Sequence, residues 1–355
     1  MKTAFVNFRM IFVLLLAALL AGCSGGAAPA TPTATPTTQP VPTATATPEP
    51  FAVLMAPDPA PSAAVELAVR AVGEFAAQQG WDLRRVSPGA EALGADRLGG
   101  PRLFASVGSG LGEAIIAAAQ ARTDIKFLAV GETGAAPSAN LLVVGSDFRR
   151  DQAAFMAGLL AGIENRNDYV GWIGEDGTVR GTIYYNGFKH GIRYICPRCR
   201  LFNLALPAAA DAGQGMSAAG SLLTNYIDTA SAVPGPAGDA ALADLAKNGV
   251  RVAGAGPDIY RTVFSGGSGA GVKNVLGEIA FRPDLLLADL LPRFLAGETF
   301  AEPVSYSLAN GGIEYAAFPN DWISAARQAY LQKILDELAA GRLDIGIDPL
   351  TGDER

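Results

Sequence analysis

Acidic, hydroxyl and aromatic side chains follow several segments that the sequence predicts to be buried strands. In a layered sheet of parallel strands, ligand-binding groups come from the carboxyl ends of the strands and from the loops after them. Carboxylates at this edge accept hydrogen bonds from ligand hydroxyl or amine groups, and amides at the start of a helix donate to ligand oxygens. The candidate ligand-binding residues chosen in this way are Asp58, Ser109, Glu132, Glu175, Asp258, Tyr260, Glu278 and Phe281.

Each of these assignments competes with a simpler structural role. Ser109 lies in a glycine-rich stretch and fits an ordinary tight turn as well as a ligand contact. Glu132 and Glu278 are either an acceptor pair for a ligand hydroxyl or amine, or solvated loop charges. Glu175 and the adjacent Asp176 fit solvated loop charges better than ligand contacts.

Catalytic motifs are absent from the sequence. It contains no P-loop, no HExxH and no GxSxG motif, and the glycines of 265–271 resemble a phosphate-binding loop only in composition. The single histidine, His190, lies with Lys189 and Arg193 away from the apolar face of a predicted helix, so we expect it to be exposed. We therefore expect no enzyme activity, no cofactor and no bound metal.

Cys196 and Cys199 form a CxxC motif directly after a predicted helix. In an exported protein this spacing most simply gives a local disulfide. A redox site is instead expected at the start of a helix that follows a strand, and a zinc site would need a further ligand besides His190.

Apolar segments of strand length alternate with segments of helical period through most of the chain. The clearest example runs from Val144 to Arg193, where a helix, the apolar strand Tyr169 to Ile173 and a second helix succeed one another. Asp147 is placed to cap the first of these helices. Gly187 and Gly191 lie on the apolar face of the second, which predicts close backbone packing against a sheet. This alternation predicts an α/β protein.

The first 22 residues have a basic start and an apolar run too short to span a bilayer, which indicates a signal peptide. Leu20-Ala21-Gly22-Cys23 looks like a lipobox, in which Cys23 is lipidated. A plain cleaved signal peptide is the alternative. Residues 23–50 are rich in Thr, Pro and Ala and predict an extended tether.

The charge and length of the chain limit its partners. The net charge is −7 and no basic cluster occurs in the body, which argues against nucleic acid. About three hundred residues follow the tether, so two lobes are expected.

Several segments together resemble the basic membrane protein family, the lipid-anchored substrate-binding components of nucleoside-type ABC importers. The matching segments, in order, are Leu103–Leu128, Asp151–Gly162, Val170–Gly191, Asn310–Phe318 and Leu338–Gly346. The resemblance implies a two-lobed fold of the type I periplasmic-binding-protein class, with each lobe a doubly wound, mostly parallel sheet flanked by helices.

The sequence departs from the family's pattern where the nucleoside should bind. The loop 56–61 lacks the family's aromatic residue, and Gly131 replaces an Asp. Asp258 alone keeps the family's charge in its loop, while Glu278 and Phe281 replace a Ser and a Lys. We therefore expect purine nucleosides to bind more weakly than in typical relatives, or not at all.

These observations predict a lipid-anchored, extracytoplasmic solute-binding protein of an ABC importer, with a small polar ligand in the interlobe cleft. Expected partners are the ligand, a permease, and the membrane through the lipid anchor only. The alternative is a ligand-sensing surface lipoprotein that reports to a membrane receptor. The expected first lobe comprises 51–146 and 256–303, and the second comprises 147–255 and 304–349.

Overall fold

The computed structural model describes residues 49–60, 62–132, 134–317 and 322–355. The predicted signal peptide, Cys23 and nearly all of the tether lie outside these residues. None of the helices in the described ranges is both long and apolar enough to cross a membrane.

The first sheet has six strands, in the order β11-β5-β4-β3-β1-β2. Every pairing in it is parallel. Its strands are β1 (Phe51–Met55), β2 (Asp82–Val86), β3 (Leu103–Val107), β4 (Lys126–Val130), β5 (Leu141–Phe148) and β11 (Val304–Tyr306). The strand β2 was not predicted, because this edge strand is mostly exposed and carries charged residues where a buried strand would be apolar.

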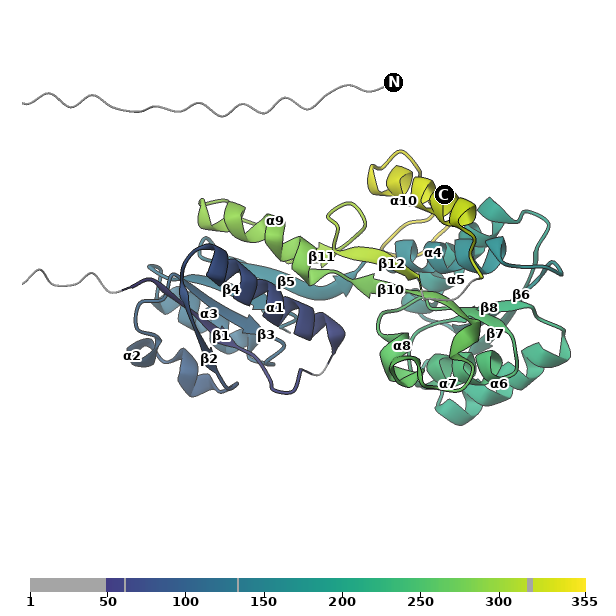
Figure 1. Ribbon diagram of the computed structural model, residues 1–355, viewed down its shortest axis with the longest axis horizontal. Coiled ribbons are helices and arrows are strands. Elements are labelled where there is room, and N and C mark those ends of the chain that lie inside the picture. Colours follow the sequence, from purple (N-terminus) through teal and green to yellow (C-terminus); the bar gives the residue numbers. More distant parts are fainter. Residues whose placement is uncertain (1–48, 61, 133, 318–321) are drawn as a thin grey trace, which may run out of the picture. The chain divides into compact units, whose positions relative to one another are not determined.

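Helices cover both faces of the first sheet (Figure 1). One face packs on α1 (Ala63–Gln78) and α9 (Pro283–Leu295), and the other on α3 (Gly112–Ala121), the short α2 (Ala95–Leu98) and a 3₁₀ turn at Ala90–Leu93. Successive residues of β1 alternate between the faces: Ala52 and Leu54 pack under α1, and Val53 and Met55 under α3. Both faces are therefore apolar.

The second sheet also has six strands, in the order β12-β10-β9-β8-β6-β7. Only β12 runs antiparallel to its neighbour among the pairings described. The strands are β6 (Tyr169–Glu175), β7 (Arg200–Leu206), β8 (Thr229–Ala232), β9 (Arg251–Ala253), β10 (Val275–Phe281) and β12 (Ile313–Ala317).

The second sheet is covered in the same manner as the first (Figure 1). Helices α4 (Arg150–Ile163), α5 (Val179–Ile195) and α10 (Ala325–Ala339) share one apolar core, and α6 (Ala212–Thr224) and α7 (Pro236–Lys247) share the other. The turn of α8 (Ile259–Thr262) follows β9. The last helix therefore belongs with the second sheet, through Leu331, Ile334 and Leu338.

The chain passes between the sheets after β5, after β10 and after β11. We expected 256–303 to belong to the first lobe, but β10 is paired with β9 and β12 in the second sheet. The chain therefore returns to the first sheet only after Phe281, at α9. Likewise, β11 within 304–349 belongs to the first sheet rather than the second.

Helices α4 and α5 pack with their backbones in direct contact. A Cβ atom on Gly191 would overlap the Phe155 carbonyl oxygen and approach the Gly158 Cα to 3.0 Å, and one on Gly187 would lie 2.8 Å from the Asp151 carbonyl oxygen. The predicted close approach is confirmed, but the partner is a helix and not a sheet.

Two helix starts also differ from expectation. The residue that precedes α4 is Arg149, and Asp147 lies within β5 with an ion pair to Arg150. The apolar period of 320–340 predicts a final helix that begins near Asn320, with Tyr330 on its apolar face. The helix begins after Ser324, and Asn320 lies outside the described residues. Tyr330 is 47% exposed.

Candidate functional site

Glu132 follows β4 at the carboxyl edge of the first sheet and is buried. One carboxylate oxygen accepts from the Ser106 hydroxyl (2.7 Å) and from the Ser109 amide (2.8 Å) and hydroxyl (2.9 Å), while the other accepts from the Leu111 amide (3.0 Å). Glu132 thus holds the glycine-rich turn before α3. The prediction of a solvated loop charge is wrong for this residue, because the carboxylate is buried in internal hydrogen bonds.

Glu175 ends β6 at the carboxyl edge of the second sheet. Its carboxylate accepts from the Thr178 hydroxyl at 2.7 Å and pairs with the Arg180 guanidinium, which also donates to the Pro234 carbonyl oxygen. Arg180 therefore joins the loop after β6 to the loop after β8. Arg180 was not among the predicted site residues, although its place in the first helical turn after a loop acid could have indicated it.

Asp258 lies before α8 with a backbone φ of 63°, in the left-handed region. Its carboxylate accepts from the amide of Ala63, the first residue of α1, at 3.3 Å. Arg261 of α8 lies 4.0 Å from Glu66 of α1. Through these contacts α8 of the second lobe meets the first turn of α1, whose amides favour a negative charge.

Glu278 lies on β10 beneath α8 and is almost fully buried. Its carboxylate accepts from the Tyr260 amide at 3.0 Å. Burial raises the pKa of Glu278 to about 7, and the negative charge of Asp258 adds to this effect. Glu132 and Glu278 belong to different sheets, and each accepts hydrogen bonds from protein groups beside it.

Phe281 packs among aromatic rings where the chain crosses between sheets. Its ring is stacked on Tyr306, at the end of β11, with centroids 4.9 Å apart. It meets Phe148, at the end of β5, edge-on at the same centroid distance. Each crossing segment therefore contributes one ring to this cluster.

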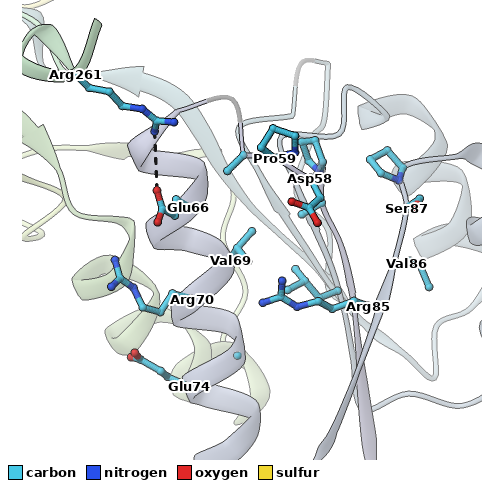
Figure 2. A pocket seen from close by; sticks show the side chains of 16 residues that line it. Asp58, Pro59, Glu66, Val69, Arg70, Glu74, Arg85, Val86, Ser87 and Arg261 are labelled. Atoms are coloured by element: carbon cyan, nitrogen blue, oxygen red, sulfur yellow. Dashed lines mark ion pairs between the residues drawn. The ribbon is translucent and has the colours of Figure 1, made fainter. Parts of the chain in front are cut away.

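A groove of about 1020 Å³ lies beside α1 (Figure 2). It runs between this helix and the ends of β1 and β2, and its volume is that of a small-molecule site, which is typically about 300–1,000 Å³. Leu54, Val69 and Val86 provide apolar lining. Of the eight ligand-binding residues predicted from the sequence, Asp58 alone lines this groove.

The charged lining of the groove comes mainly from residues that were not predicted as ligand-binding. Arg85 is on β2, Arg70 and Glu74 are on α1, and Arg261 is contributed by α8. Arg85 was not predicted as a site residue because its strand, β2, was not predicted. A register that pairs Arg85 with Leu54 of β1 places this arginine beside the groove.

Comparison with known proteins places the chain in a family. A family profile described as "ABC transporter substrate-binding protein PnrA-like" matches residues 97–315, which include strands of both sheets. The chain belongs to this family. Its members are substrate-binding proteins of ABC transporters rather than enzymes, so a substrate-binding role is supported.

Solved structures share the fold at low sequence identity. An ABC transporter solute-binding protein from Conexibacter woesei is 20% identical, with a TM-score of 0.58 over 83% of this chain and 98% of that one. A transcriptional activator of the comK gene from Bacillus halodurans is 14% identical, with a TM-score of 0.59 over 82% and 99%. A solute-binding protein from Aeropyrum pernix is 14% identical, with a TM-score of 0.52 over 83% and 93%. No curated protein matched the chain in a sequence search.

In this member of the family, Cys196 and Cys199 are joined by a disulfide, as their spacing predicted. Asp168 lies close to both sulfur atoms. Sulfurs joined to each other are not thiolates, which are the form that binds metal. His190 is less exposed than expected, because its Nε2 lies 2.7 Å from a carboxylate oxygen of Glu354 in the C-terminal tail.

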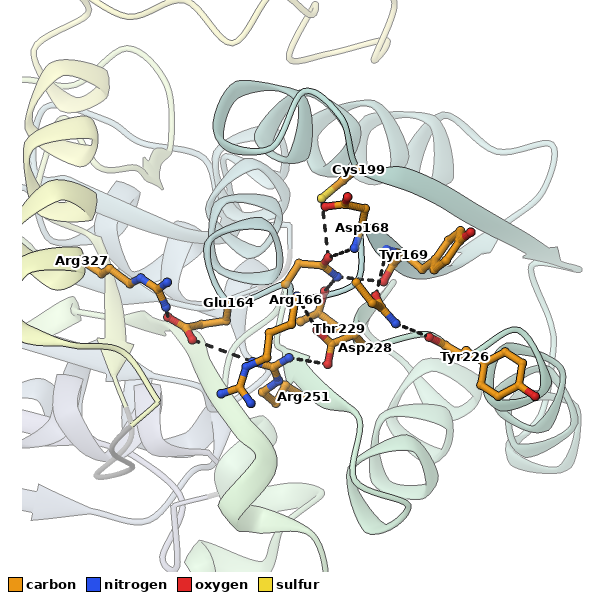
Figure 3. A network of polar contacts seen from close by, with 12 residues as sticks. Glu164, Arg166, Asp168, Tyr169, Cys199, Tyr226, Asp228, Thr229, Arg251 and Arg327 are labelled. Carbon is orange, nitrogen blue, oxygen red and sulfur yellow. Dashed lines mark hydrogen bonds and ion pairs between the residues drawn. The ribbon is translucent and has the colours of Figure 1, made fainter.

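A polar network lies at the opposite, amino-terminal edge of the second sheet (Figure 3). Glu164, at the end of α4, accepts from Arg327 of α10 at 2.7 Å, and its other oxygen lies 3.9 Å from Arg251 at the start of β9. Arg251 also pairs with Asp228, just before β8. These contacts join helices to the strand starts, away from the edge that carries the candidate site.

Proposed function

We propose that this chain is the solute-binding protein of an ABC importer, held at the extracytoplasmic face of a cell membrane by lipid on Cys23. Its solute is a small polar molecule that binds at the carboxyl edges of the strands. The observation that carries this proposal is the family match, because it spans strands of both sheets and reaches the loops at those edges.

The mechanism we propose is closure of the two lobes on the solute. The chain crosses between the sheets after β5, β10 and β11, and bending at such segments is how two-lobed proteins close around ligands. Solute that binds the closed form better shifts the population toward it, and the permease then recognises that form.

The ligand class of the family is nucleoside-like, and we propose that specificity has diverged in this chain. Phe281 replaces the family's lysine and packs in the crossing cluster, and the carboxylates of Glu132 and Glu175 are bound to other groups of the protein. These groups are therefore less available to a nucleoside than the family's pattern requires.

Thermal unfolding of the full chain in detergent, followed by tryptophan fluorescence, tests this function. The panel comprises nucleosides, sugars, amino acids and small cations. A ligand that binds only the folded state raises the unfolding midpoint as its concentration increases. We expect one solute class to do so and guanosine or inosine to give little shift. A large shift with either purine nucleoside would contradict the divergence, and no shift with any compound would contradict solute binding.

The identity of the membrane partner distinguishes the ligand-sensing alternative from transport. Crosslinking of the full chain in its native membrane is expected to capture a permease. Capture of a receptor with a signalling domain, and of no permease, would instead favour the ligand-sensing lipoprotein.

A further inference from the structure

The groove beside α1 presents two opposite charges that have no bonding partner among the described residues. Asp58 follows β1 and Arg85 lies on β2, and both are exposed. In Figure 2 the Asp58 carboxylate and the Arg85 guanidinium point into the same space between α1 and the strands. They do not form an ion pair with each other, so each is open to a group on a ligand.

The other charges of the groove are arranged differently. Arg261 is paired with Glu66 at 4.0 Å, the contact drawn in Figure 2. Arg70 and Glu74 are four residues apart on α1 and are therefore neighbours on the helix surface, away from the strands in Figure 2. Asp58 and Arg85 are thus the charges that face the groove from the strand side.

The space between these two charges has an apolar lining. Leu54 of β1 is buried, and Val69 of α1 is half-buried. Pro57, Pro59 and Pro88 form part of the rim, where their fixed φ angles limit loop motion. An apolar lining with a few convergent polar groups is the usual composition of a small-molecule site.

We propose that this groove binds a zwitterionic solute with an apolar middle, such as an amino acid or short peptide with free ends. The guanidinium of Arg85 binds the carboxylate in bidentate geometry, and the carboxylate of Asp58 accepts from the ammonium group. Arg261 contributes to the lining from the second lobe, so closure of the lobes acts on the same groove. This inference rests on the proposed function, because it names the class of solute.

Thermal unfolding and calorimetry of the full chain in detergent test the proposal with L-leucine, dileucine and trileucine. N-acetylated forms lack the ammonium group, and amidated forms lack the carboxylate. We expect at least one free zwitterion to bind saturably. Each blocked form is expected to bind at least about tenfold more weakly, because each lost contact is a charged hydrogen bond.

Substitutions within the chain test the two residues separately. Asp58→Asn is expected to remove the preference for the free amine, and Arg85→Gln the preference for the free carboxylate. Asp82→Asn and Arg84→Gln are matched controls on the same strand: these residues pair with each other at 3.2 Å, and Arg84 lies over the Phe51 ring on the opposite face. The control variants are expected to bind as the unchanged chain does.

The outcomes separate this inference from the proposed function. Tight binding of inosine or a sugar with no zwitterion binding would overturn the zwitterion site and leave solute binding intact. Zwitterion binding that is unchanged in Asp58→Asn and Arg85→Gln would also overturn the zwitterion site and leave solute binding intact. No binding by any compound would overturn both. The blocked ligands act on the unchanged chain, so the test stands even if a variant fails to fold.

Discussion

At the scale of single residues, the acids that the sequence selects at the sheet edges mostly serve the protein itself. Glu132, Glu175 and Glu278 each accept hydrogen bonds from neighbouring groups of the protein. Sequence position could place these acids at the carboxyl edges of the sheets, because carboxyl ends of parallel strands meet there. It could not show which acids are already bonded, since those contacts depend on side-chain orientation across loops distant in sequence.

Glu278 gives a prediction about pH. Its pKa in the folded protein is raised to about 7 by burial, whereas in the unfolded chain it has its ordinary value of 4.5. Between these values the folded state holds the proton and the unfolded state does not, so this residue lowers stability as the pH rises. Above about pH 7 both states are ionised and the penalty is constant.

Glu278→Gln removes this titration while keeping an oxygen to accept from the Tyr260 amide. We expect the variant to be more stable than the unchanged chain at pH 8, by roughly 2–3 kcal/mol, and similar to it at pH 4.5. Urea unfolding at both pH values measures the difference. An equal effect at both pH values would contradict the titration.

At the scale of elements, the helix pair α4 and α5 depends on glycines where the backbones touch. Gly191→Ala would push a methyl group into the Phe155 carbonyl and is expected to destabilise the fold by roughly 1–3 kcal/mol. The matched control is Gly220→Ala in α6, where an added Cβ meets nothing within 4 Å. Alanine is the better helix former, so the control should be neutral or stabilising by up to about 1 kcal/mol.

Denaturant unfolding measures both glycine variants. Equal effects for Gly191→Ala and Gly220→Ala would mean that the close contact between α4 and α5 has no special cost. The sequence could predict that Gly191 needs a close neighbour, because a glycine on an apolar helix face is otherwise unfavourable. It could not identify α4 as the neighbour, since the apolar period of a helix shows which face is buried but not which element packs against that face.

The network at the amino-terminal edge of the second sheet is expected to stabilise the attachment of α10. The Glu164 side chain is 2% exposed, and Glu164→Gln removes the charge that pairs with Arg251 and Arg327. Breaking such a buried pair costs roughly 3 kcal/mol. Glu337→Gln removes an exposed pair with Arg342 and should cost much less, because solvent screens that pair. Equal destabilisation of the two variants in urea unfolding would contradict a stabilising role for this network.

At the scale of the whole molecule, the alternation of strands and helices was sufficient to predict two layered α/β lobes. The placement of β10 in the second sheet and of β11 in the first was not predictable from composition, because a short strand can have the same composition in either sheet. The groove beside α1 was missed for the same reason as β2: charged edge strands lack the apolar signal of central ones.

The lipid anchor is a whole-molecule prediction that concerns residues outside the described structure. Cys23→Ser removes the only thiol of the proposed lipobox, so incorporation of radiolabelled palmitate should be lost and the protein should leave the membrane fraction. Cys196 and Cys199 are joined in a disulfide and serve as an internal control. Palmitate labelling that persists in Cys23→Ser would contradict the anchor.

The central claim is that this chain binds a small polar solute, and isothermal titration of the full chain in detergent tests it most directly. The titrant is the compound that gives the largest thermal shift. We predict saturable heat with one solute bound per chain, and weaker or no heat with guanosine and inosine. An absence of saturable heat for every class of compound in the panel would contradict a solute-binding function.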